Sequence, residues 1–133
     1  MNLYYLIAGI LSILLGAIHT IVGEKLIFQS KKEEGQFIPS REGGEWKEDH
    51  VRIIWASWHM ATAFAWALAA IILFIAFNVQ ELPPEWVTIL IISASLSMLT
   101  GSVLVLLGTK GKHPGWIVLL LIGLLLLIGY FLP

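Results

Sequence analysis

The stretch LYYLIAGILSILLGAIHTIVG, residues 3–23, decides the fold. It contains no charged side chain and has the length of about 20 residues that a helix needs to cross the hydrocarbon core of a membrane. Comparable uncharged runs follow at 53–79, 86–109 and 116–133, the last being mostly leucine and near the short limit. The repetitive stretch LLLIGLLLLIGY, residues 119–130, lacks the polar and apolar alternation of a transmembrane β-barrel. The chain is therefore predicted to be an all-α polytopic membrane protein with four transmembrane helices.

These four helices are expected to form one domain, residues 1–133, arranged as an up-down bundle. Consecutive Pro83 and Pro84 end one helix and begin the next, and GTKGKHPGW, residues 108–116, is a short turn. Glycine and proline interrupt the longer connection between the first two helices. The expected helices cover about 3–27, 47–78, 85–108 and 114–132, with a loop at 28–46.

The composition agrees with a membrane protein and excludes several kinds of function. Hydrophobic residues make up 58% of the chain and charged residues only 13%, which is far more apolar than a soluble domain of this size. The net charge of −1 gives no reason to expect nucleic acid as a partner. The absence of cysteine excludes disulfide exchange, thiolate catalysis and thiolate metal sites.

The distribution of basic residues predicts how the helices cross the membrane. All eight lysines and arginines lie either in the segment from Glu24 to Arg52, which contains the loop and the adjoining helix ends, or in the turn after the third helix. Both segments are on one side of the predicted bundle. Loops rich in lysine and arginine face the cytoplasm. We therefore expect a bacterial inner (plasma) membrane protein whose charged loops are cytoplasmic and whose two termini lie on the outer side.

A stripe of small residues runs along the first predicted helix. Gly9, Gly16 and Gly23 recur at helical spacing, and such stripes let membrane helices approach closely. A homo-oligomer formed through this stripe is one expectation. His19 lies in the same stripe and should face protein, whereas Glu24 is about 140° further around a regular helix. Glu24 joins His19 only if the helix is distorted at Gly23.

The second helix presents polar and aromatic residues at the matching spacing, including His59. Ionisable groups inside a membrane segment are expensive and usually functional. Imidazole and carboxylate ligands suit iron, copper or zinc, so His19, His59 and Glu24 are the candidate metal or haem ligands. Residues expected around this site or at its mouth are Arg52, Trp55, Trp58, Thr62, Ser97, Thr100 and His113.

Three interpretations of this site stay open. A transition metal or b-type haem between His19 and His59 would make the protein redox-active, with gaps at Gly16 and Gly23 giving room for the haem. Alternatively the histidines join helices in a non-catalytic assembly or interaction subunit. A third interpretation is proton transfer in an oligomeric transporter or channel. The sequence leaves open whether the protein is an enzyme.

Two segments together resemble a known group of proteins. GAIHTIVGEKLI, residues 16–27, and RIIWASWHMATAFAW, residues 52–66, are similar to segments of small bacterial four-helix membrane proteins of uncharacterised function. That group carries His-Ser/Thr-x-x-Gly-Glu on helix one and Trp-His on helix two. The resemblance implies that the histidines and the glutamate act as one unit, and implies no reaction. The matching residues are His19, Thr20, Gly23, Glu24, Trp58 and His59.

Overall fold

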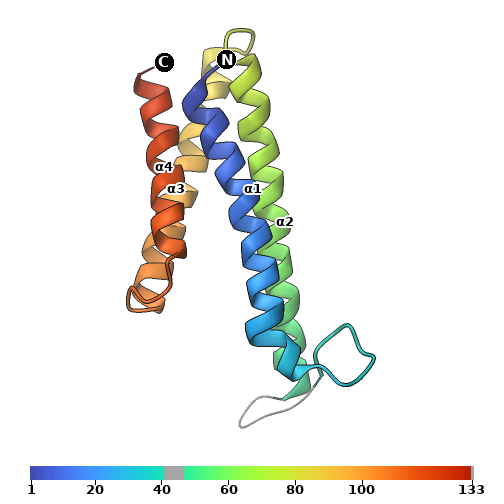
Figure 1. Ribbon diagram of the computed structural model, residues 1–133. Helices are drawn as coiled ribbons and strands as arrows, with labels where there is room; N and C mark the ends of the chain where they lie inside the picture. Colours follow the sequence, from blue (N-terminus) through green and yellow to red (C-terminus); the bar gives the residue numbers. More distant parts are fainter. Residues whose placement is uncertain (41–46, 133) are drawn as a thin grey trace. The chain divides into compact units, whose positions relative to one another are not determined.

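The computed structural model describes residues 1–40 and 47–132, and within these ranges all of the regular secondary structure is helical (Figure 1). The prediction of an all-α chain with four helices is confirmed for these residues. Part of the predicted loop 28–46, with Arg41, lies outside the described residues. The α-helices are α1 (Leu3–Gly23), α2 (Glu48–Asn78), α3 (Pro84–Gly108) and α4 (Gly115–Phe131), and the short elements η1 (Glu24–Phe28) and η2 (Gln29–Lys31) extend α1.

Three of the helical segments are long and apolar enough to cross a membrane. They are Leu3–Lys31, with 29 residues, Glu48–Asn78, with 31, and Pro84–Gly108, with 25. Helix α4 has only 17 residues, which at 1.5 Å per residue gives about 25 Å against a hydrocarbon thickness of about 30 Å. The fourth predicted helix is thus present but shorter than a typical span.

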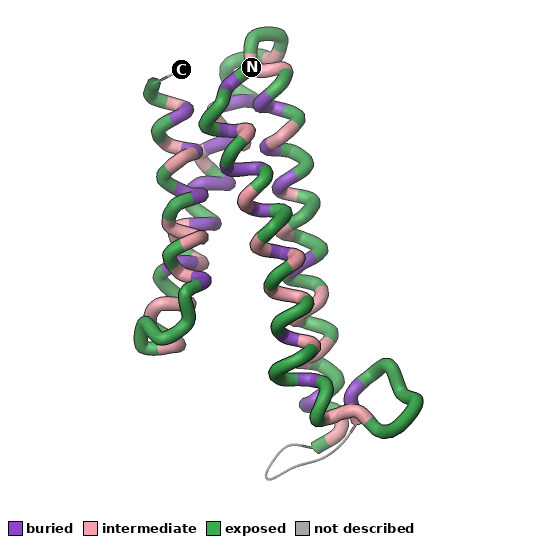
Figure 2. Tube along the Cα trace, in the orientation of Figure 1, coloured by how far each residue is buried: buried purple, intermediate pink, exposed green. Residues whose placement is uncertain are grey.

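Exposed residues recur along each of these helices (Figure 2), and many of them are large and apolar. Examples are Ile18, Phe64, Leu104 and Leu107, each more than half exposed. Exposed aliphatic and aromatic side chains in such numbers are unfavourable in water and are the normal surface of a helix in lipid. The structure is therefore compatible with a multi-pass membrane protein.

The regular α-helix of the first segment ends at Gly23 and continues as a π-helical turn, η1. A π-helix places more residues in each turn than an α-helix, so it changes which residues face a neighbour. In a regular helix Ile27 would follow Gly23 on the buried face. Instead Ile27 is 43% exposed and Phe28 is 1% exposed. The inward-facing position has moved by one residue at this turn.

The chain divides into two compact units. The first comprises Met1–Leu15 and Trp66–Pro133, and the second comprises Gly16–Ala65. The first unit contains the start of α1, the end of α2, and the α3–α4 hairpin. Its apolar core is formed by residues from all four helices. The core side chains include Tyr5, Ala8, Ile72, Ile75, Ile91, Met98, Ile122 and Leu126.

In the first unit, α3 and α4 are joined by hydroxyl groups that donate to main-chain carbonyls. Ser95 Oγ donates to the carbonyl of Gly123, and Ser102 Oγ donates to the carbonyl of Trp116, both at 2.8 Å. A Cβ atom at Gly123 would lie 2.8 Å from the side chain of Leu99, so this glycine permits the close approach. Helix α4, whose sequence suggests mainly lipid contact, therefore packs closely on α3.

The start of α1 lies beside the ends of two other helices in this unit. The main-chain nitrogen of Asn2 donates to the carbonyl of Ala76 at 2.8 Å, and its Nδ2 donates to the carbonyl of Gly129 at 2.9 Å. The start of α1 therefore adjoins the ends of α2 and α4. This is the arrangement that an up-down connection of these helices requires.

Two glycines of the predicted stripe lie against side chains of α2. A Cβ atom at Gly9 would lie 2.6 Å from the side chain of Leu73, and one at Gly23 would lie 2.2 Å from Nε1 of Trp58. Both glycines therefore accommodate side chains of α2 in the same chain. The homo-oligomer expected from this stripe stays a prediction.

Candidate functional site

The second unit contains the three predicted ligands His19, Glu24 and His59, together with Trp58. The Trp58 indole stacks on the imidazole of His19, with ring centroids 4.0 Å apart and an interplanar angle of 5°. Its Nε1 donates to the main-chain carbonyl of His19 at 3.0 Å. The same ring covers Gly23, where no larger residue would fit. Trp58 therefore fills the space beside Gly23, which is one of the two gaps that the sequence suggested for a haem.

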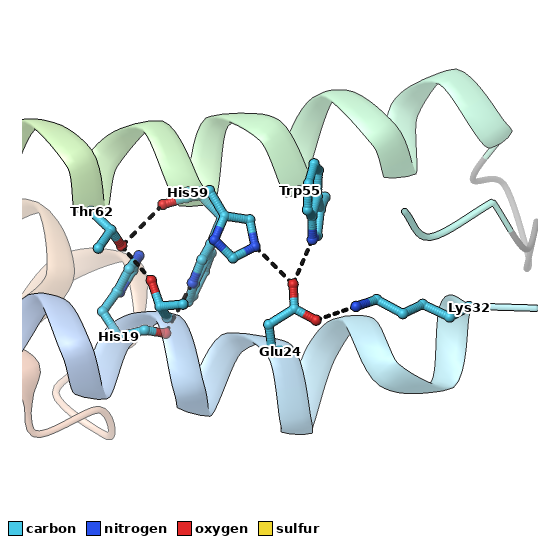
Figure 3. A network of polar contacts seen from close by, with 8 residues as sticks. His19, Glu24, Lys32, Trp55, His59 and Thr62 are labelled. Atoms are coloured by element: carbon cyan, nitrogen blue, oxygen red, sulfur yellow. Dashed lines mark hydrogen bonds and ion pairs between the residues drawn. The ribbon is translucent and has the colours of Figure 1, made fainter. Parts of the chain in front are cut away.

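Glu24 is the acceptor for three donors from different parts of the unit (Figure 3). Its Oε1 accepts from Trp55 Nε1 at 2.5 Å and lies 2.8 Å from His59 Nε2. Its Oε2 accepts from the ammonium group of Lys32. Glu24 is the first residue of the π-helical turn, and this distortion after Gly23 accompanies its approach to α2. We refer to Glu24, Lys32, Trp55 and His59 as the Glu24 cluster.

The charges of the Glu24 cluster are balanced within the chain. The carboxylate of Glu24 forms an ion pair with Lys32, and the imidazole of His59 supplies a further hydrogen bond. Their side chains are 24%, 19% and 26% exposed. A carboxylate that is partly removed from water is stabilised by a cation and by hydrogen-bond donors. The cluster therefore needs no additional cation to be electrically neutral.

Aromatic rings surround the cluster. Trp55 and His59 meet edge to face with centroids 4.6 Å apart, and Phe37 meets Trp55 in the same manner at 5.6 Å. Phe28 is fully buried and contacts both Trp58 and His59, at centroid distances of 5.8 and 6.4 Å. These rings lower the water content around Glu24, which strengthens its hydrogen bonds.

Two threonines join the helices beyond Trp58. Thr20 Oγ1 donates to Thr62 Oγ1 at 2.9 Å, and Thr62 is 4% exposed. Hydrogen bonds of this kind between helices are common in membrane proteins. Thr62 therefore joins α2 to Thr20 of α1, and its predicted role beside the histidines stays a prediction.

The three predicted ligands do not converge. Glu24 and His59 are in contact, whereas the ring of His19 stacks on Trp58. Among the described residues there is no group of three or more His, Cys, Asp or Glu side chains arranged to hold a metal ion. The structure thus brings two of the three predicted ligands together, and the metal or haem site that would include His19 stays a prediction.

Several predicted neighbours have other partners. Arg52 forms an ion pair with Glu48 at 2.7 Å, and both side chains are about half exposed. Ser97, Thr100 and His113 belong to the other compact unit. Ser97 Oγ donates to the carbonyl of Ser93 in its own helix, and Thr100 is exposed. His113 Nδ1 accepts from the main-chain nitrogen of Gly115 at 3.0 Å.

Two members of the site were missed in the sequence, namely Phe28 and Lys32. Both follow Glu24 at intervals of four residues, which is close to helical spacing, so the sequence carried a signal for them. Lys32 was counted only as a loop charge that indicates orientation. Phe28 was placed in the loop because the helix was expected to end at residue 27.

Comparison of the chain with protein-family models, curated proteins and solved structures found no significant match. The interpretation of the Glu24 cluster therefore depends on its geometry and chemistry.

Proposed function

We propose that the chain is a non-catalytic multi-pass membrane protein in which His19, Glu24 and His59 fasten helices together. The main support is that Glu24 already accepts from Lys32 and Trp55 and meets His59, all from the same chain. A carboxylate that acts on a substrate or metal has to exchange such partners for that ligand. Here the carboxylate is already engaged on both oxygens, and the space beside Gly23 is filled by Trp58.

The proposal includes the orientation of the protein in the bacterial plasma membrane. All eight lysines and arginines lie either in the segment from Glu24 to Arg52 or in the α3–α4 turn, on one side of the predicted bundle. The positive-inside rule then places this side in the cytoplasm and both termini outside. The cluster would thus fasten α1 to α2 near the cytoplasmic face, where the polar side chains reach the headgroup region.

Elemental analysis of detergent-purified protein, together with its absorption spectrum, tests this proposal. We expect no stoichiometric metal and no haem absorbance in the wild-type protein. We also expect His59→Ala and Glu24→Gln to unfold at lower temperature than the wild type. Near-stoichiometric iron, copper or zinc that is lost in both variants would overturn the proposal.

A second candidate function is metal binding by Glu24 and His59 alone. The observation that favours it is the 2.8 Å separation of Glu24 Oε1 and His59 Nε2, which brings a carboxylate and an imidazole together at a partly exposed position. A metal ion there would take the place of the shared proton and displace Lys32. Removing Lys32 distinguishes the two functions. Lys32→Met should increase metal affinity if the pair is a metal site, and should only lower stability if it fastens helices.

A further inference from the structure

The first unit contains a cavity that the Glu24 cluster does not touch. Its volume is about 510 Å³, and it lies between the start of α1, the α2–α3 turn and the end of α4. This size falls within the range of small-molecule sites. All of the residues that line it belong to the first compact unit.

One polar group of the cavity wall is not used by the fold. Tyr5 is 1% exposed and lines the cavity, and its hydroxyl makes no hydrogen bond to a described residue. In the described part of the chain, every side-chain polar atom that is sealed from solvent has a hydrogen-bond partner. The Tyr5 hydroxyl is therefore not sealed, and the cavity that its ring lines is where it is accessible. The Tyr5 hydroxyl is thus a hydrogen-bond donor without an acceptor among the described residues, on a side chain that is otherwise buried.

The other buried or half-buried polar side chains beside it already have partners. The single hydroxyl hydrogen of Thr88 is donated to the carbonyl of Pro84 at 2.8 Å. The 3.2 Å contact between Thr88 Oγ1 and Tyr130 Oη must then use the Tyr130 hydrogen. The side chain of Asn2 donates to the carbonyl of Gly129 and accepts from the nitrogens of Tyr4 and Tyr5. Gln80 also lines the cavity, but it is exposed. Among the buried side chains of the described lining, the free donor is therefore Tyr5.

The lining also limits the charge of a ligand. No Asp, Glu, Lys, Arg or His side chain is among the described residues that line the cavity, and the one formal charge of this lining is the main-chain ammonium group of Met1, a residue that is 67% exposed. The rest of the wall is formed largely by Val79, Leu82, Pro84 and Val87. A charged group held against these apolar side chains would lose hydration without gaining a counter-charge from any side chain of the lining. An uncharged ligand with an apolar body fits these conditions.

We infer that this cavity binds an uncharged, membrane-soluble carbonyl compound, whose carbonyl oxygen accepts the hydrogen bond of Tyr5. Carbonyl groups on apolar bodies occur in quinones and in acylglycerols, and both are dissolved in membranes. The cavity adjoins the ends of the predicted membrane helices, where such molecules place their polar groups. The inference concerns the first unit and does not depend on the role of Glu24.

The three tyrosines of the chain allow a direct test. Tyr5 and Tyr130 line the cavity, whereas Tyr4 does not and is 37% exposed. The protein is labelled with 3-fluorotyrosine, and its ¹⁹F spectrum in detergent is assigned with single Tyr→Phe variants. A short-tailed benzoquinone and dioctanoylglycerol are titrated separately, with decane as the probe without a carbonyl and decanoate as the charged probe.

We expect at least one of the two carbonyl probes to shift the Tyr5 and Tyr130 resonances saturably and to leave Tyr4 unchanged. The probe that does so identifies the source of the carbonyl. Tyr5→Phe should weaken that binding about fivefold, which corresponds to the loss of one neutral hydrogen bond. Tyr4→Phe is the matched control and should leave the affinity unchanged.

Four results would overturn the inference. They are the absence of a saturable shift with both carbonyl probes, equal shifts of all three tyrosines, equal binding of decane or decanoate, and an unchanged affinity in Tyr5→Phe. Because Tyr130 is observed in the Tyr5→Phe protein itself, its resonance also reports whether that variant keeps the fold around the cavity.

Discussion

Glu24 and His59 are 35 residues apart in the chain, and their side chains meet with Oε1 and Nε2 only 2.8 Å from each other. Glu24 belongs to a π-helical turn and His59 to the regular helix α2. The contact therefore joins a distorted segment to a regular one. The following predictions concern this contact and the packing around it.

Replacing Glu24 with glutamine should destabilise the protein. The amide keeps the size of the side chain but removes the negative charge, which leaves Lys32 without its counter-ion. Because these side chains are about a quarter exposed, we expect a loss of only about 1–2 kcal/mol in the free energy of unfolding. Unfolding in mixed detergent, followed by circular dichroism, measures this loss.

The control for this prediction is Glu34→Gln, which changes the same atoms at an exposed position. Its unfolding free energy should equal that of the wild type. If Glu24→Gln were equally harmless, the cluster would not fasten the helices.

Gly23→Ala should be more damaging, because the new methyl group would lie 2.2 Å from Nε1 of Trp58. The indole would have to leave its stack with His19. Overpacking of this kind costs about 1–3 kcal/mol. The expected result is a lower unfolding free energy together with a changed tryptophan emission spectrum.

Gly108→Ala is a matched control at the end of another helix, since a Cβ atom there would meet nothing within 4 Å. It should leave stability unchanged or raise it slightly. Equal losses in the two variants would mean that backbone effects, and not the Trp58 contact, explain the requirement for glycine.

The hydrogen bond between Thr20 and Thr62 should contribute a small and measurable coupling. Thr→Val removes the hydroxyl group and keeps the branched shape. A double-mutant cycle of Thr20→Val and Thr62→Val should give about 0.6 kcal/mol, the average for hydrogen bonds between membrane helices. Additive losses would show that the two hydroxyl groups do not interact.

The predicted orientation can be measured with single cysteines, because the chain contains none. Glu34 and Gln80 are exposed positions in the connections after η2 and after α2. In intact cells a membrane-impermeant thiol reagent should label Gln80→Cys and spare Glu34→Cys, which reacts only after lysis. The reverse pattern would invert the proposed topology.

The positions of the helices could be predicted from the sequence because each helix is specified by many residues together. Long uncharged runs determine the helices, and their predicted ends differ from the observed α-helices by at most one residue, except after Gly23. The pairing of α1 with α2 near the histidines also followed from helical spacing. The seam through Trp55, His59 and Thr62 does face the end of α1, where all three side chains make contacts.

The candidate site was harder to predict, because it depends on one local distortion and on the choice among similar polar residues. A regular helix directs Glu24 away from the face of His19, and periodicity alone does not locate a π-helical turn. In α3, Ser97 and Thr100 were expected to face inward, but Ser95 and Ser102 make the bonds to α4. Their seven-residue spacing fits a helical face equally well, so hydropathy could not separate the two sets.

The π-helical turn also makes the length of this segment as important as its composition. Residues 24–28 hold one more residue than a regular turn would need to bring the chain to the same place. Deleting a single residue here would favour a regular helix and rotate everything after it, so that Phe28 and Lys32 would no longer meet α2 and Glu24. Distant relatives should therefore tolerate exchanges of amino acid in this segment far more readily than a change in its number of residues.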